Sequence, residues 1–319
     1  MLPNEVTYAE IAALIDGSKD APPIIGLADG NQPITVDLDD DSPHVLAASG
    51  AGRGKTVLLR TVLSQALAAG GHGVIFDPKI ISHPWAEDLA KCEYHRSVET
   101  IHDRLLVLRE EAARRAGVAG HIDVGPRIWV LIEELGPLVN RLIRYWREIK
   151  APGEPDASPA VEALCKLLGT GAEQRRVQVG AGPIAPIKMH VVASTQRSSA
   201  ALGMGGLAGW ENFGTRCLAD YPPHVWRLLR RDVSPLPSRS RHRGRWQVVA
   251  TDDTVTETQV GFFSPREART LAECGWSRLA LPAPGRCAQV LTWFRERFGR
   301  ARAGRGGAVS RRLTGGGSR

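Results

Sequence analysis

The chain alternates short apolar segments with longer segments in which apolar residues recur every three or four positions. The first pattern is typical of buried strands and the second of amphipathic helices. Strands are predicted at 45–48, 74–76, 128–132, 189–193, near 215–218 and near 246–250, and helices at 4–16, 57–69, 97–116, 135–148 and 160–169. Because buried strands alternate with helices, we expect an α/β fold with a mostly parallel sheet flanked by helices.

Two further segments complete this outline. Residues 24–38 alternate between apolar and polar positions and turn at Asp29-Gly30-Asn31, which predicts a short N-terminal β-hairpin. Residues 17–23 and the Pro/Gly-rich residues 151–158 read as linkers. The sequence shows no internal repeat.

A glycine-rich segment connects the strand at 45–48 to the helix that follows it. It reads Ser49, Gly50, Ala51, Gly52, Arg53, Gly54, Lys55, Thr56. Such a loop turns backbone N–H groups toward one point and places a phosphate at a helix N-terminus. Lys55 is expected between the β- and γ-phosphates of ATP, and Thr56 on Mg²⁺.

The alternative is a glycine-rich turn without a ligand, which the flanking strand and helix disfavour. The usual pattern has glycine six residues before the lysine, where this chain has Ser49. Gly50 and Gly52 are expected to supply the backbone freedom that the loop needs.

The predicted strand at 128–132 ends in Glu133-Glu134. In phosphate-loop enzymes an acid at this position holds Mg²⁺, and a neighbouring acid orients or deprotonates the attacking water. We therefore assign Glu133 to the metal and Glu134 to the water. Two acids could also simply mark a helix N-terminus, where negative charge is favourable, but their pairing with the glycine loop supports the catalytic interpretation.

The predicted strand at 189–193 is followed by Ser194-Thr195-Gln196-Arg197. A glutamine at a strand end can sense the γ-phosphate or position its water, so Gln196 is a candidate catalytic residue. Ser194 or Thr195 could instead cap the next helix, and the two roles are compatible.

Charge is distributed unevenly over the chain, which has a net charge of +7. Residues 295–319 hold eight arginines and one glutamate, residues 227–245 hold seven arginines and one aspartate, and the remainder is net acidic. Arginine clusters suit phosphate backbones, which favours a nucleic-acid partner. The alternative is a solubilising or disordered tail without a fixed partner.

Other features exclude several classes of protein. Of the 319 residues 43% are hydrophobic, enough for a substantial core, but no apolar segment approaches the roughly 18 residues that cross a bilayer. No signal peptide is visible. The five cysteines form no Cys-x-x-Cys pair and predict a reduced, cytoplasmic protein. Cys92 and His95 lack a second pair that would complete a zinc site, so they and the other histidines are interpreted as structural.

Together these segments resemble the FtsK/SpoIIIE family of ring-forming DNA translocases. The resemblance covers about residues 21–270, and its most specific parts are the Asp-Pro-Lys and Thr-Gln-Arg segments. The matching segments are Pro43-His44-Val45-Leu46, Asp77-Pro78-Lys79, Arg114-Arg115, Thr195-Gln196-Arg197 and Asn212-Phe213-Gly214-Thr215-Arg216.

The resemblance implies a RecA-like P-loop NTPase domain at 21–272, between an N-terminal helix and linker at 1–20 and a C-terminal helix with an arginine-rich, basic tail at 273–319. It further implies DNA-dependent ATP hydrolysis and a homo-oligomeric ring, a hexamer, around double-stranded DNA. A neighbouring subunit would supply an arginine to the γ-phosphate: Arg216 is the candidate, and Arg175 or Arg176 the alternatives.

Three departures from the family pattern stand out. Ser49 replaces a glycine, Glu133 replaces the usual aspartate, and the sequence shows neither membrane spans nor room for a DNA-reading module after about residue 270. A stand-alone motor of this kind is similar to the transfer proteins of actinobacterial conjugative plasmids and integrated elements. We expect a cytoplasmic protein that membrane-associated transfer partners recruit.

Two rival functions remain at this stage. One is a non-translocating ATP-dependent switch or adaptor for a DNA or membrane partner, which the departures at Ser49 and Glu133 keep open. The other is a phosphate-loop enzyme acting on a small molecule, such as a kinase, which leaves the arginine-rich segments unexplained.

Overall fold

The structure is a computed structural model of the 319-residue chain. It describes residues 2–15, 17–38, 43–118, 123–177, 187–196, 212–220, 226, 240 and 242–275. The strands are β1 (Val6–Thr7), β2 (Ile24–Leu27), β3 (Pro33–Thr35), β4 (Val45–Ser49), β5 (His72–Phe76), β6 (Cys92–His95), β7 (Ile128–Ile132), β8 (Met189–Thr195), β9 (Thr215–Ala219), β10 (Arg245–Val249) and β11 (Val255–Phe262). The helices are α1 (Tyr8–Ala12), α2 (Lys55–Ala68), α3 (Val98–Val118), α4 (Leu135–Ile149), α5 (Pro159–Val177) and α8 (Pro265–Cys274), with 3₁₀ turns η1 (Asp29–Asn31) and η2 (Pro84–Ala86).

All the described strands join one sheet with two halves of different character. Its order is β3-β2-β11-β10-β9-β4-β8-β7-β5-β6, and β1 pairs with β11. From β9 to β6 every neighbouring pair is parallel, whereas β9, β10, β11, β2 and β3 pair antiparallel in turn. The predicted mostly parallel α/β sheet is therefore confirmed in the half that carries the glycine loop.

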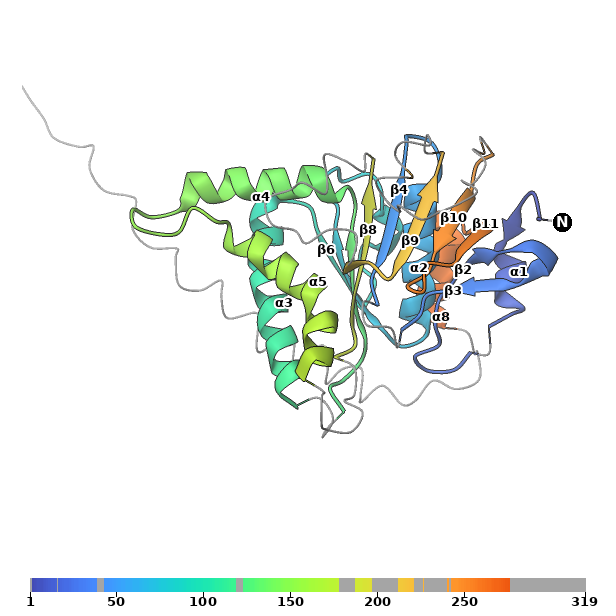
Figure 1. The fold of residues 1–319 in the computed structure, drawn as a ribbon, viewed down its shortest axis with the longest axis horizontal. Helices are drawn as coiled ribbons and strands as arrows, with labels where there is room; N and C mark the ends of the chain where they lie inside the picture. Colours follow the sequence, from blue (N-terminus) through green and yellow to red (C-terminus); the bar gives the residue numbers. More distant parts are fainter. Residues whose placement is uncertain are drawn as a thin grey trace, which may run out of the picture. The chain divides into compact units, whose positions relative to one another are not determined.

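The parallel strands are apolar because helices cover both of their faces. Every residue of β4, β5, β7 and β8 is buried. Figure 1 shows α3, α4 and α5 together on one side of the strands, while α2, with α8 beside it, packs on the parallel strands β4, β5, β7 and β8 as well as on β2 and β11. Since the strands are parallel, the carboxyl ends of β4, β5, β7, β8 and β9 meet at one edge of the sheet.

The N-terminal helix is shorter than the predicted 4–16. Val6 and Thr7 pair with Gly261 and Phe262 of β11, and α1 follows. Thr7 begins this helix through a capping box with Glu10: the Thr7 side chain accepts the Glu10 backbone N–H, and the Glu10 carboxylate accepts the Thr7 N–H. Strand pairing and this cap together place the helix start at Tyr8.

Other predictions agree with the structure in outline. The hairpin at 24–38 is present as β2, η1 and β3, and the helix at 160–169 is the first part of the longer α5. The strands β6 and β11 and the helix α8 were not predicted. Among the described residues, none of the helices has the length and apolar composition that a bilayer crossing requires.

Candidate nucleotide-binding site

The glycine loop connects β4 directly to α2. Gly52 and Gly54 have φ values of 73° and 99°, in the left-handed region that favours glycine. Gly54 is the N-cap of α2 and provides no side-chain cap, so the N–H groups of the first helical turn are available to an anion. Ser49, by contrast, is the last residue of β4 and pairs with Ala219. An extended position needs no glycine, so this departure costs no backbone strain.

Lys55 is folded back over the loop. Its Nζ donates to the backbone oxygens of Ser49 and Gly50, each at 3.0 Å. Burial lowers the pKa of Lys55, while the negative charges of Glu134 and Glu133 oppose this shift. Both acids therefore act electrostatically on the lysine of the loop, as the sequence-based site requires.

Thr56 and Glu133 are in direct contact. The Thr56 Oγ1 donates to Glu133 Oε1 at 3.1 Å, and the other carboxylate oxygen, Oε2, lies 2.9 Å from Nε2 of His83. A hydroxyl and a carboxylate are hard oxygen ligands, and Mg²⁺ is commonly held by one or two protein groups together with substrate phosphates. The pair next to the phosphate loop fits this chemistry, so Thr56 and Glu133 are the residues that would hold Mg²⁺.

Glu134 lies where three strand ends meet. Its backbone is left-handed, with φ 63° and ψ 72°, and its N–H donates to the Ser194 Oγ at 2.9 Å. Its Oε1 accepts a hydrogen bond from Gln196 Nε2 and lies 2.7 Å from the Lys79 Nζ. Ser194 therefore binds the backbone of Glu134; the residues after Gln196, which a cap by Ser194 or Thr195 would involve, lie outside the described part of the chain. The structure brings two of the predicted catalytic residues, Glu134 and Gln196, together.

Arg53 connects the glycine loop to a neighbouring strand end. Its guanidinium lies 2.6 Å from the carboxylate of Asp220, the residue after β9, and both side chains are mostly buried. This ion pair links residues 167 positions apart. It holds the loop against the same edge of the sheet, so Arg53 contributes to the site by positioning the loop.

Arg216 lies outside this cluster. It is the second residue of β9, beside Leu46 of β4, and so near the amino end of the strands. Its guanidinium lies 2.8 Å from Asp253 in the turn between β10 and β11, and burial lowers its pKa. An arginine acting in a neighbouring subunit need not lie at its own subunit's loop, so its role stays a prediction.

Several predicted residues lie outside the described part of the chain. Arg197, most of 227–245 and all of the tail from 276 are among them, and the side chains of Arg175 and Arg176 are not described.

Two groups at the site were missed in the sequence. Lys79 was noted only as part of the Asp-Pro-Lys segment, and His83 was interpreted as structural. Lys79 carries a signal only as part of that segment and His83 carries none, because the contacts of both residues with the acids depend on how the loop after β5 folds.

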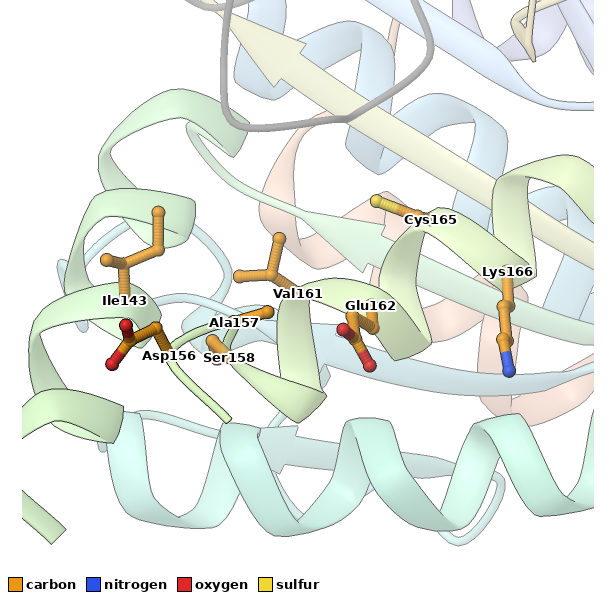
Figure 2. A pocket seen from close by; sticks show the side chains of 8 residues that line it. All are labelled: Ile143, Asp156, Ala157, Ser158, Val161, Glu162, Cys165 and Lys166. Atoms are coloured by element: carbon orange, nitrogen blue, oxygen red, sulfur yellow. The ribbon is translucent and has the colours of Figure 1, made fainter. Parts of the chain in front are cut away.

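A pocket elsewhere in the molecule does not coincide with this chemistry. It has a volume of about 590 Å³ and lies between α4 and the start of α5. Figure 2 shows its side chains, which include none of the residues of the glycine loop or the strand ends. We therefore identify the candidate site by its convergent polar groups rather than by this pocket.

Comparison with known proteins identifies the class of this fold. No protein-family model matches the chain, and no curated protein matches it in sequence. Among solved structures, the pCW3 conjugation coupling protein TcpA, in monomer form with ATPγS, is 17% identical with a TM-score of 0.58, over 85% of this chain and 75% of that chain. EssC (ATPases 2 and 3) from Geobacillus thermodenitrificans is 14% identical with a TM-score of 0.61, over 92% of this chain and 53% of that one.

The cytoplasmic domain of the type VII secretion ATPase EccC from Thermomonospora curvata is also similar, at 14% identity and a TM-score of 0.53, over 83% of this chain and 28% of that chain. This chain thus spans about half of the solved EssC chain and about a quarter of the solved EccC chain. The fold is that of the P-loop ATPases. Within that class its structural neighbours are ATPases of the FtsK/SpoIIIE type, which confirms the sequence resemblance at the level of the fold.

Proposed function

We propose that this protein is an ATP-driven translocase of double-stranded DNA that acts in conjugal transfer of a plasmid or integrated element. The observation that carries the proposal is the convergence of Lys55, Thr56, Glu133, Glu134 and Gln196 on one edge of the parallel sheet. These residues come from a phosphate loop and two other strand ends, which is the arrangement that ATP hydrolysis needs.

The residues divide the work as follows. Backbone N–H groups at the start of α2 and the Lys55 ammonium would bind the phosphates of ATP. Thr56 and Glu133 would hold Mg²⁺, which when bound neutralises charge on the phosphate oxygens. Glu134 would orient and deprotonate the attacking water, and Gln196, which contacts its carboxylate, would fix the position of that water.

Support for DNA as the partner comes from two sources. One solved structure with this fold is that of a conjugation coupling protein. The two arginine-rich segments, 227–245 and 295–319, suit a polyanion and would grip phosphates without reading sequence. We propose a homo-oligomeric ring, a hexamer, around the duplex, at the cytoplasmic side of a membrane where transfer partners recruit it.

The test is ATP turnover with and without long duplex DNA. A translocase should be stimulated many-fold by the duplex, and the stimulation should fall steeply as salt rises, because phosphate contacts release counterions. Turnover that DNA does not change at any salt concentration would contradict translocation, but it would not contradict the proposed ATPase activity.

A second candidate is an ATP-dependent switch or adaptor that does not translocate DNA. It is favoured by the similarity to EssC and EccC, the second of which is named as a secretion ATPase, so the fold alone does not separate a DNA substrate from another cargo. Slow, DNA-independent turnover together with nucleotide-dependent binding of a partner would favour this candidate.

A further inference from the structure

The loop after β5 is organised by one buried carboxylate. Asp77 Oδ2 accepts the backbone N–H groups of Ser82, at 2.8 Å, and His83, at 3.3 Å, as well as the hydroxyl of Tyr94, at 2.6 Å. Its Oδ1 accepts the N–H of Lys79 at 3.2 Å. These bonds fold the loop so that Lys79 reaches Glu134 and His83 reaches the neighbouring acid. One loop therefore supplies a partner to each acid at the end of β7.

His83 is fully buried between a tryptophan and a glutamate. The Trp85 Nε1–H lies 3.3 Å from His83 Nδ1, and an indole N–H can only donate. His83 Nδ1 therefore accepts and carries no proton, which leaves the proton of the ring on Nε2. Nε2 consequently donates to Glu133 Oε2, at 2.9 Å. Trp85 fixes the tautomer, and the tautomer fixes the direction of the bond to Glu133.

We propose that His83 is a positioning residue that orients Glu133 for Mg²⁺, an inference that rests on the proposed nucleotide site. Its bond to Oε2 leaves Oε1 facing Thr56, so the Thr56 hydroxyl and one carboxylate oxygen of Glu133 lie side by side. A glutamate has one more rotatable bond than the aspartate of the FtsK/SpoIIIE pattern. The imidazole removes the freedom that this extra bond adds, and because it donates as a neutral ring it does not cancel the charge of the carboxylate.

The experiment measures nucleotide affinity rather than turnover. Dissociation constants for a fluorescent ADP analogue are determined in EDTA and in saturating Mg²⁺. The ratio of the constant in EDTA to the constant in Mg²⁺ reports how strongly bound metal tightens nucleotide binding. Loss of an outer partner of a metal ligand typically weakens metal binding about 10–100-fold. In His83→Ala we expect the ratio to fall by about tenfold or more, with the affinity in EDTA unchanged.

Two other variants separate positioning from folding. His83→Gln can place an amide N–H near the position of Nε2 and should restore most of the ratio. His72→Ala is the matched control: His72 is also a buried histidine bonded to a glutamate, Glu93, at 3.0 Å, but it lies at the opposite end of β5. It should leave the ratio as in the wild type. Thermal unfolding of each variant checks that the fold is retained.

The outcomes distinguish this inference from the proposed function. If the wild type binds no nucleotide, the nucleotide site itself is refuted. If the wild type shows Mg²⁺ coupling and His83→Ala shows the same ratio, only the role of His83 is refuted. If His83→Ala fails to fold, His83→Gln decides: a folded glutamine variant with a wild-type ratio supports the inference, and one with the ratio lost overturns it.

Discussion

Thr56 Oγ1 donates a hydrogen bond to Glu133 Oε1 over 3.1 Å, although 77 positions separate the two residues in the chain. The contact joins the first turn of α2 to the end of β7, the two elements that supply the phosphate loop and the acids. Because the hydroxyl and the carboxylate meet beside the loop, these two groups could hold one Mg²⁺ next to the place where the loop would bind the phosphates of a nucleotide.

Lys55→Ala should abolish ATP hydrolysis and greatly weaken ATP binding. The ammonium is the only group assigned here to bridge the β- and γ-phosphates, and its present partners are two backbone oxygens of the loop, so its loss should not unfold the protein. Turnover, nucleotide affinity and thermal unfolding are measured together. Lys166→Ala, on α5, is the control and should behave as the wild type. Hydrolysis retained in Lys55→Ala would refute the site.

Glu134→Gln should stop turnover while leaving nucleotide affinity nearly unchanged. A residue acting as general base contributes about 10²–10⁴-fold to the rate, but it is not needed to bind phosphates. Glutamine keeps the size of the side chain and an oxygen for Gln196 or Lys79 to contact. The matched variant Glu133→Gln should instead reduce Mg²⁺-dependent affinity. If the two variants behave alike, the division of roles between the acids is wrong.

The sequence predicts most of this site because its residues directly follow strands. The all-apolar segments at β4, β7 and β8 locate the strand ends, and the topology of a parallel sheet then brings the following polar residues to one edge. The bond between His83 and Glu133 could not be predicted in this way, since it depends on how the carboxylate of Asp77 folds an irregular loop.

The antiparallel half of the sheet was harder to predict, because polar residues interrupt the apolar pattern of one of its strands. The strand β11 includes Thr258 and Gln259, polar residues that are buried, so its apolar pattern is interrupted. The helix α8, in contrast, has a recognisable start that was overlooked. Ser264 and Glu267 form a capping box with Pro265 at the first turn, which is a local signal that a sequence can carry.

Arg216→Ala should lower DNA-stimulated turnover and preserve nucleotide binding, if Arg216 reaches the γ-phosphate of a neighbouring subunit. An arginine supplied in this way is worth about 10³–10⁵-fold in rate. Asp253→Ala is the control because it removes the partner of Arg216 within the same chain and leaves the guanidinium in place. If both variants lose the same stability, and turnover falls in both only as far as the folded fraction does, the arginine is structural. Arg175 and Arg176 would then be tested in its place.

Removing residues 300–319 should weaken DNA binding and make it less sensitive to salt. The deletion takes away six arginines, and each phosphate contact contributes about −0.9 to the slope of log affinity against log salt concentration. We therefore expect the slope to become shallower by several units, up to about five. Affinity is measured on one duplex over a range of salt concentrations. An unchanged slope would show that the tail does not grip phosphates.

Protein stability should fall as the pH decreases from about 6.5, because of two buried histidines. Burial lowers the pKa of His44 to about 4 and that of His190 to about 3. The histidines of the unfolded chain therefore bind protons at a pH at which those of the folded chain do not. The free energy of unfolding decreases as the pH falls below the histidine pKa of the unfolded chain, and it levels off only below the histidine pKa values of the folded chain. Each histidine adds a slope of up to about 1.4 kcal/mol per pH unit within that window.

The matched variant changes both histidines to asparagine. His44 Nδ1 accepts the Val191 N–H at 3.0 Å and His190 Nδ1 lies 2.9 Å from the Pro43 oxygen, and an asparagine amide can make either contact without titrating. Denaturant unfolding between pH 5 and 6.5, above the range in which most carboxylates titrate, should give a slope lower by about 2 kcal/mol per pH unit than in the wild type. Each single variant should give half of this change. A double variant with the wild-type slope would show that other groups produce the pH dependence.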